Sequence, residues 1–169
     1  FRWLGHTLLR RAHTPTGFRE RIVYFWADHF TAYGKGGVIK RATSPYIEEA
    51  IRPNITGRFA DLLIACVTHP VMLHFLDQVN SVGPQSIMAK RRGNKKGLNE
   101  NLAREVLELH TLGVGGPYSQ NDVRELAMLF TGMSFQPNKG FKFRKDQIEP
   151  GPEVVLGKPY GDKGTMAPI

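Results

Sequence analysis

The sequence predicts a mainly α fold, a multi-helix orthogonal bundle that is followed by a small C-terminal β-hairpin. Over the first two-thirds of the chain, apolar residues recur with the period of an α-helix, and helix-capping and helix-stopping residues separate these segments. Near the C-terminus the pattern changes to short apolar runs bounded by Pro and Gly, which is typical of strands. We therefore expect a helical domain over residues 1–136, with a β-hairpin appendage and a truncated tail of the same domain over 137–169.

The helices are predicted from their apolar spacing and their ends. Thr16 is an expected N-cap, Ser44-Pro45 has the pattern of a helix start, and Ser119 with Asp122 three residues later resembles a capping box. Residues 80–97 are long and polar, so we expect a loop there. The predicted helices are 1–12, 18–33, a shorter one from Ser44, 57–68, 70–79, 99–112 and one from Ser119 to Gly132.

Two short strands are expected after the last helix. Phe141–Phe143 and Val154–Leu156 are apolar runs, and a loop rich in Pro and Gly joins them.

Length and composition indicate which classes of protein the chain can belong to. With 169 residues and 41% apolar residues, the chain is long enough for one domain with a core. It contains no apolar run of the length that spans a membrane. Its one cysteine, Cys66, lies in an apolar helix and is expected to be a small buried hydrophobe.

The chain is basic, and the excess is locally concentrated. Lys and Arg number 23 against 15 for Asp and Glu, which gives a net charge of +8. Five of these cations fall within residues 90–96, which we interpret as a solvated loop with an anionic partner as the alternative. No aromatic residues are interleaved with them, which argues against nucleic acid as the partner.

The most informative segment is the predicted helix 99–112. At 100° per residue, Glu105 falls inside an apolar arc, whose members are Leu98, Leu102, Val106, Leu109 and Leu112. A carboxylate in such an arc must find a partner or shift its pKa, because burying an unpaired charge is costly. Asn101 and Glu108 flank Glu105 on the same side of the helix, so these three side chains could present oxygen atoms to one ion.

A second chemistry-bearing residue is His29 in the predicted helix 18–33. On a helical wheel His29 lies within a stripe of apolar and aromatic residues, Phe18, Ile22, Phe25 and Tyr33. A buried imidazole needs a hydrogen-bond partner, and Glu105 is the partner that we expect. His29 and Glu105 are therefore the candidate catalytic residues. His29, Asn101, Glu105 and Glu108 are the candidate ligands of a divalent metal.

The other histidines favour structural roles. His69 precedes Pro70 and is expected to be an N-cap, and His74 is expected on a polar face. His110 lies two residues from Glu108 and so faces a different direction; we expect it to pack near the helix C-terminus. Zincin, α/β-hydrolase, Walker and Cys-x-x-Cys signatures are absent from the sequence.

The segment Asn99–Gly113, followed by Tyr118–Val123, resembles the core of a bacterial family named as domain of unknown function 1800. Further motifs agree in order along the chain, and the resemblance covers nearly all of residues 18–161. They are Phe25-Trp26 with His29-Phe30, Gly57-Arg58-Phe59 with Leu62-Leu63 and His69-Pro70, Leu76-Asp77, and Val155-Leu156-Gly157-Lys158.

The resemblance implies no established activity. It does imply that the chain is part of a longer bacterial polypeptide, whose remainder would be its partner. It also implies export to the periplasm or the cell exterior, and a sulfatase-like protein encoded nearby. Two positions depart from the family pattern: Met133 stands where Trp is common, and Ile148 where His is common. If that His serves a shared site, this chain lacks one ligand.

Two functional hypotheses follow. The first is an exported metal-assisted hydrolase or oxidoreductase, in which His29 and Glu105 are ligands or the acid–base pair, Glu108 is a further ligand and Asn101 orients them. The second is a non-catalytic scaffold or surface-interaction domain, in which the same residues only hold helices together.

Overall fold

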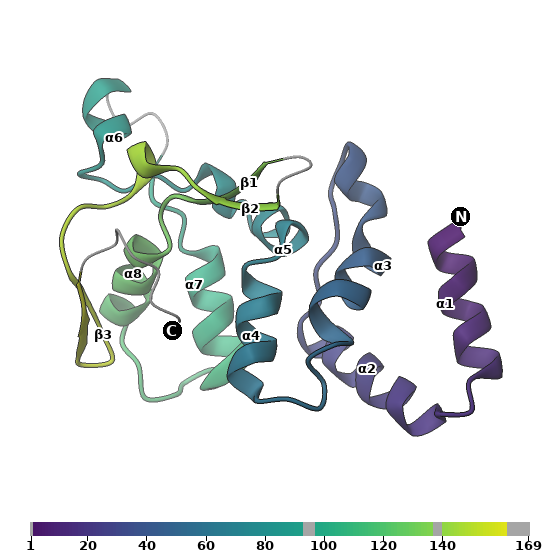
Figure 1. Cartoon of the computed structure of the whole chain (residues 1–169). Coiled ribbons are helices and arrows are strands. Elements are labelled where there is room, and N and C mark those ends of the chain that lie inside the picture. The colour runs from purple at the N-terminus through teal and green to yellow at the C-terminus, as the bar shows by residue number, and fades with distance from the viewer. Residues whose placement is uncertain (1, 93–96, 137–139, 162–169) are drawn as a thin grey trace. The chain divides into compact units, whose positions relative to one another are not determined.

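The computed structural model describes residues 2–92, 97–136 and 140–161. Contacts divide the chain into two compact units, residues 1–75 and 76–169. The mainly α class is confirmed, as is the small antiparallel β structure near the C-terminus (Figure 1). The division into a helical domain over 1–136 and an appendage over 137–169 stays a prediction.

The first unit consists of helices. In chain order they are α1 (Arg2–His13), α2 (Gly17–His29), the 3-10 turn η1 (Val38–Arg41), α3 (Thr43–Tyr46), the π-helix η2 (Ile47–Ile51), α4 (Phe59–Val67) and α5 (Pro70–Phe75). α3 continues directly into η2, whose wider turn is closed by the bond from Arg52 N to Ile47 O, 2.9 Å long. η2 packs against both α2 and α4.

The core of the first unit gathers around η2. The fully buried side chains include Val23, Phe30, Tyr46, Ile51, Leu62, Cys66 and Val71. An ion pair fastens α2 to the residue after η2: Arg52 donates from Nη1 and Nη2 to the two carboxylate oxygens of Glu20, at 2.5 and 2.9 Å. Glu20 is buried, and the Arg52 hydrogen bonds are the main reason that its pKa is lowered.

The second unit combines helices with short strands. It contains the 3-10 turn η3 (Gln78–Asn80), α6 (Ile87–Arg92), α7 (Asn101–Glu105), the π-helix η4 (Val106–Thr111), α8 (Gln120–Leu129), β1 (Met133–Gln136), β2 (Gly140–Phe143), the 3-10 turn η5 (Lys145–Gln147), β3 (Glu153–Val155) and β4 (Lys158–Tyr160). α7 packs against α8, and α8 against β3. Their shared core includes Leu102, Val106, Val123, Leu126, Phe130 and Val155.

The strands form two separate antiparallel pairs. β1 pairs with β2 in the register Met133 with Phe143, and β3 pairs with β4 in the register Glu153 with Tyr160. The prediction therefore identified strand segments at 141–143 and near 154–156, but each pairs with its own neighbour in the chain. Few residues separate the strands of each pair in the sequence, and a short connection closes at a smaller entropic cost than a long loop does.

Several helix ends differ from the prediction. α2 ends at His29 rather than at residue 33, and α5 ends at Phe75. The predicted loop 80–97 contains α6, which Ser86 caps by accepting a bond of 3.2 Å from Ala89 N. Lys90 and Arg91 are thus helical, whereas residues 93–96 of the predicted basic loop lie outside the described residues. Within the described residues, none of the helices has the length and apolar character that crossing a membrane requires.

Candidate functional site: an acidic helix with a π-turn

The candidate site lies on α7 and its continuation η4. α7 follows Asn99, whose Oδ1 accepts a bond of 2.9 Å from Asn101 N at the start of the helix. After Glu105 the helix widens to the π form, and Leu112 N donates to Leu107 O over 2.9 Å. π-helical turns are rare and occur frequently at functional sites.

The π-turn changes which side chains face the core of the second unit. The buried residues are Leu102, Ala103, Val106, Leu107 and His110. Leu109 and Leu112, which the α-helical period placed in the apolar arc, are instead 55% and 38% exposed. The predicted arc is therefore wrong at its C-terminal end, because a π-turn holds more residues per turn and rotates later side chains away from their α-helical positions.

Glu108 belongs to a network of charged and amide groups. Its Oε1 accepts a bond of 2.8 Å from Nη1 of Arg104. Nη2 of Arg104 donates to Glu100 at 3.3 Å and to Gln120 on α8 at 2.9 Å. Glu100 and Glu108 are each four residues from Arg104 on the helix, and the bond to Gln120 connects this helix to the start of α8.

Glu105 lies outside this network. Its side chain is half-buried, and within the described residues it makes no hydrogen bond or ion pair. Burial raises the pKa of the Glu105 carboxyl, and the neighbouring Glu108 carboxylate raises it further. Of the two outcomes that the sequence allowed, a partner or a shifted pKa, the structure shows the second.

Asn101 and Glu108 share the helix with Glu105, as predicted. Asn101 is exposed at the first turn, and Glu108 is half-buried one turn after Glu105. Glu108 already has Arg104 as its partner, so a cation would compete with a guanidinium for this carboxylate. Among the residues that the structure describes, no three His, Cys, Asp or Glu side chains are grouped so that they could hold a metal ion.

His29 lies in the first unit, at the end of α2, and is half-buried. Its ring meets the rings of Phe30 and Trp26 edge-on, with centroids 4.7 and 5.4 Å away. The predicted stripe around it is largely exposed: Phe18 is 78% and Phe25 62% exposed. The buried face of α2 carries Glu20 and Val23 instead. The pairing of His29 with Glu105 stays a prediction.

The remaining titratable groups have structural surroundings. His69 Nδ1 accepts a bond of 3.2 Å from Val71 N at the start of α5, as expected of an N-cap. Burial lowers the pKa of His69. Cys66 is fully buried, and burial raises its pKa to about 12, which disfavours the nucleophilic thiolate at neutral pH. His110 is buried, as its predicted packing role requires.

Sequence reasoning missed the part that Arg104 plays. Its spacing from Glu100 and Glu108 indicates two i,i+4 ion pairs, but Arg104 also donates to Gln120 on α8. No sequence signal marks this contact, because it depends on the packing of two helices. The η4 turn was missed for a similar reason, since no residue in 106–111 breaks the helical pattern.

These features define a mainly α protein whose candidate site is a half-buried carboxyl on a π-widened helix. A family model described as "Protein of unknown function (DUF1800)" matches residues 2–167, and the chain belongs to this family. Among curated proteins none matches the chain, and the same holds for solved structures.

Proposed function

We propose that this protein is an enzyme in which Glu105 transfers a proton. The observation that carries the proposal is the contrast between neighbouring carboxyl groups: Glu108 is bonded to Arg104, whereas Glu105 is half-buried with a raised pKa and no partner among the described residues. A carboxyl group with a raised pKa is better suited to donate and accept a proton than one with the ordinary pKa.

The reaction class in this proposal is hydrolysis or oxidoreduction in an exported protein. A metal-assisted form of the same proposal takes His29, Asn101, Glu105 and Glu108 as ligands of a divalent metal. It requires these side chains to converge when the ion binds, because no such group is formed among the described residues. Carboxylate and amide oxygens with one imidazole nitrogen form a plausible set for such an ion. When bound, the metal would activate water or polarise a substrate oxygen. In the other form of the proposal, Glu105 and His29 are the acid–base pair instead of ligands, and Glu105 holds or releases the proton at its carboxyl group.

The test is metal analysis of the full-length protein together with two variants. Glu105→Gln removes the proposed proton-transfer group, and Glu100→Gln removes an equal charge from the start of the same helix. The proposal expects metal in the wild type and in Glu100→Gln, and a proportional loss in Glu105→Gln. No metal in any sample, with a lower melting temperature for Glu105→Gln, would contradict it.

The second candidate function is a non-catalytic scaffold or surface-interaction domain. One observation favours it: Leu109, Leu112 and Val114 follow Glu105 closely and are all exposed, Val114 by 79%. Exposed apolar side chains in close succession are typical of a surface that contacts another protein. In this alternative His29 and Glu105 have structural roles only, and Glu105→Gln would change stability or partner binding with no metal bound in any sample.

A further inference from the structure

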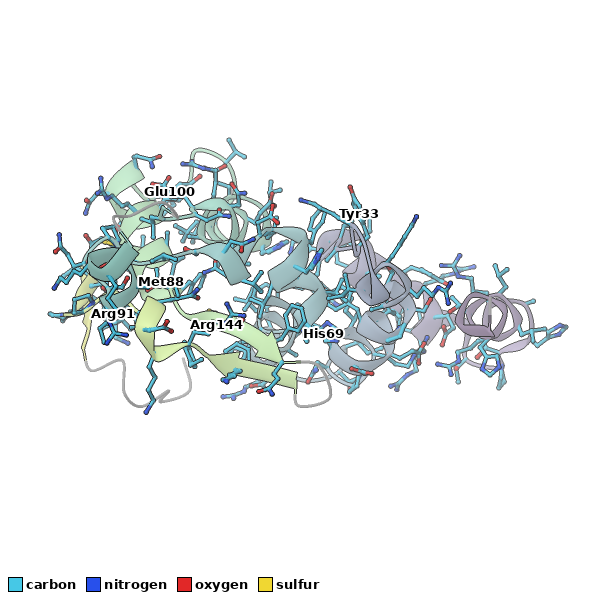
Figure 2. All side chains as sticks on the ribbon, turned by 90° about the horizontal axis from the view of Figure 1, so that it is seen from above. Tyr33, His69, Met88, Arg91, Glu100 and Arg144 are labelled. Carbon is cyan, nitrogen blue, oxygen red and sulfur yellow. The ribbon has the colours of Figure 1, made fainter. Side chains whose placement is uncertain are left out.

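Four exposed cations in the second unit come from two segments that pack together. Lys90 and Arg91 lie on α6, and Arg144 and Lys145 lie at the start of η5. α6 packs against η5, and Gln147 Nε2 lies 3.6 Å from the sulfur of Met88 between them. Figure 2 labels Arg91 and Met88 of α6 and Arg144 before η5 in the same part of the second unit. We call Lys90, Arg91, Arg144 and Lys145 the basic face.

Four arginines outside the basic face have carboxylate partners. Arg10, Arg52, Arg58 and Arg104 each form a salt bridge with a carboxylate. Among the described residues, no salt bridge is made by any of the four cations of the basic face. Asp146 is the one exposed carboxylate within η5. The face therefore has a net positive charge that the rest of its unit does not neutralise, and an anionic partner is its electrostatic complement.

An apolar side chain accompanies these charges. Ile87 opens α6 and is 52% exposed. Positions three and four residues apart share one face of a helix, so Ile87 lies on the same side as Lys90 and Arg91. An apolar residue beside cations suits a lipid interface, where the apolar group can enter the acyl boundary while the cations meet anionic headgroups.

From this arrangement we propose that the basic face binds the surface of a membrane containing anionic lipids. Ile87 favours lipid over nucleic acid, because an aliphatic side chain neither stacks on bases nor bonds to phosphates. The cations contact the headgroup phosphates, and Ile87 inserts below them. This interaction is independent of Glu105 and of the proposed enzymatic activity.

The experiment is a vesicle sedimentation assay with the full chain. One set of vesicles contains phosphatidylglycerol and phosphatidylcholine, and the other contains phosphatidylcholine alone. The wild type is expected to bind only the anionic vesicles, and added salt is expected to weaken binding because exposed charges are screened. Binding to neither set at low salt, or equal binding to both, would overturn the proposal.

Two double variants separate the contribution of the basic face to vesicle binding from the contribution of the net charge of the protein. Arg91→Gln with Arg144→Gln is expected to weaken binding about 25-fold, from about fivefold per cation. Arg21→Gln with Arg124→Gln removes the same charge from two exposed arginines elsewhere and is expected to leave binding nearly unchanged. Equal losses in the two pairs would show that net charge alone acts and would overturn the proposal. Circular dichroism melts check that both pairs fold.

The apolar contribution has its own variants. Ile87→Ser is expected to weaken vesicle binding about tenfold, whereas Ile87→Leu is expected to retain it. Full binding by Ile87→Ser would contradict insertion of this side chain. A DNA duplex serves as the probe for the other macromolecule: duplex binding that depends on Arg91 and Arg144, without vesicle binding, would assign the face to nucleic acid and overturn the proposal.

Discussion

Arg104 and Glu108 form an ion pair on the helix made of α7 and η4. This pair distinguishes Glu108 from Glu105, the other half-buried Glu of this helix. Nη1 of Arg104 donates to Glu108 Oε1 over 2.8 Å, and Glu105, three residues earlier, has no such donor among the described residues. Burial without a donor disfavours the charged form of Glu105. The site thus places a carboxyl with a raised pKa next to a carboxylate that is held in place.

The raised pKa of Glu105 predicts how stability depends on pH. Because the pKa is higher in the folded state, this carboxyl favours folding at pH values below its unfolded pKa, and that contribution is lost as the pH rises through the folded pKa. In Glu105→Gln this loss of stability with rising pH is absent, because a glutamine side chain does not ionise. We expect the variant to melt at a higher temperature than the wild type at neutral pH, and the difference to shrink in acid.

Thermal melts across a series of pH values measure this difference. Glu100→Gln is the matched control, since Glu100 accepts bonds from Arg104 and Gln120. A lower melting temperature for Glu105→Gln at neutral pH would mean that Glu105 holds a stabilising partner.

The ion pair between Arg52 and Glu20 is expected to be important for the stability of the first unit. Arg52→Ala leaves the buried Glu20 carboxylate unpaired, which costs about 3–5 kcal/mol of unfolding free energy. Urea denaturation measures this loss. Arg58→Ala is the control, because Arg58 and Asp61 form an exposed pair, and it is expected to change little. Equal effects of the two substitutions would contradict the structural role of Glu20.

The same pair predicts an acid dependence. Arg52 lowers the pKa of Glu20, so the stabilisation is present above the unfolded pKa of the carboxyl and is lost as the pH falls through the folded pKa. In Arg52→Ala this part of the acid dependence is expected to disappear. Denaturation midpoints at acidic and neutral pH measure it, and an unchanged acid dependence in the variant would contradict the assignment.

Ser119 is expected to stabilise α8 through its capping box. Its Oγ accepts a bond of 3.2 Å from Asp122 N, and Asp122 accepts one of 2.8 Å from Ser119 N. Ser119→Ala is expected to cost about 1 kcal/mol, and Ser119→Thr to retain most of the stability because Thr also caps helices. Chemical denaturation compares the two variants, and equal losses would show that the hydroxyl is not what matters.

Gly83 is expected to tolerate no side chain. A Cβ there would lie 2.6 Å from the backbone N and Cα of Glu149, which cannot move independently of the chain. Gly83→Ala is expected to cost about 1–3 kcal/mol through overpacking. At Gly97 a Cβ would meet nothing within 4 Å, so Gly97→Ala is the matched control. Similar melting temperatures for the two variants would contradict this close approach.

Local signals in the sequence predicted much of the fold. Ser119 with Asp122 marked the start of α8, and His69 marked the start of α5, because a cap depends on residues within one turn. The helical class and the burial of Cys66 also followed from local apolar spacing.

The candidate site was predicted less completely. The α-helical period predicted that Leu109 and Leu112 are buried, but in the π-helix η4 both are exposed. No residue type in that segment indicates a π-helix. The strand pairing was missed because apolar strand patterns do not indicate which segments pair. α6 was missed because the polar composition of residues 80–97 favoured a loop. The sequence did predict that Glu105 must find a partner or have a shifted pKa. That prediction needed only the position of Glu105 among apolar residues of the helix.

The most direct test of the account is an NMR titration of the Glu105 carboxyl carbon in the folded protein, with Glu108→Gln as the comparison. The account predicts that the pKa of Glu105 lies above the ordinary value for Glu and falls in Glu108→Gln, because one of its two causes is then removed. A pKa at or below the ordinary value in the wild type would contradict the account.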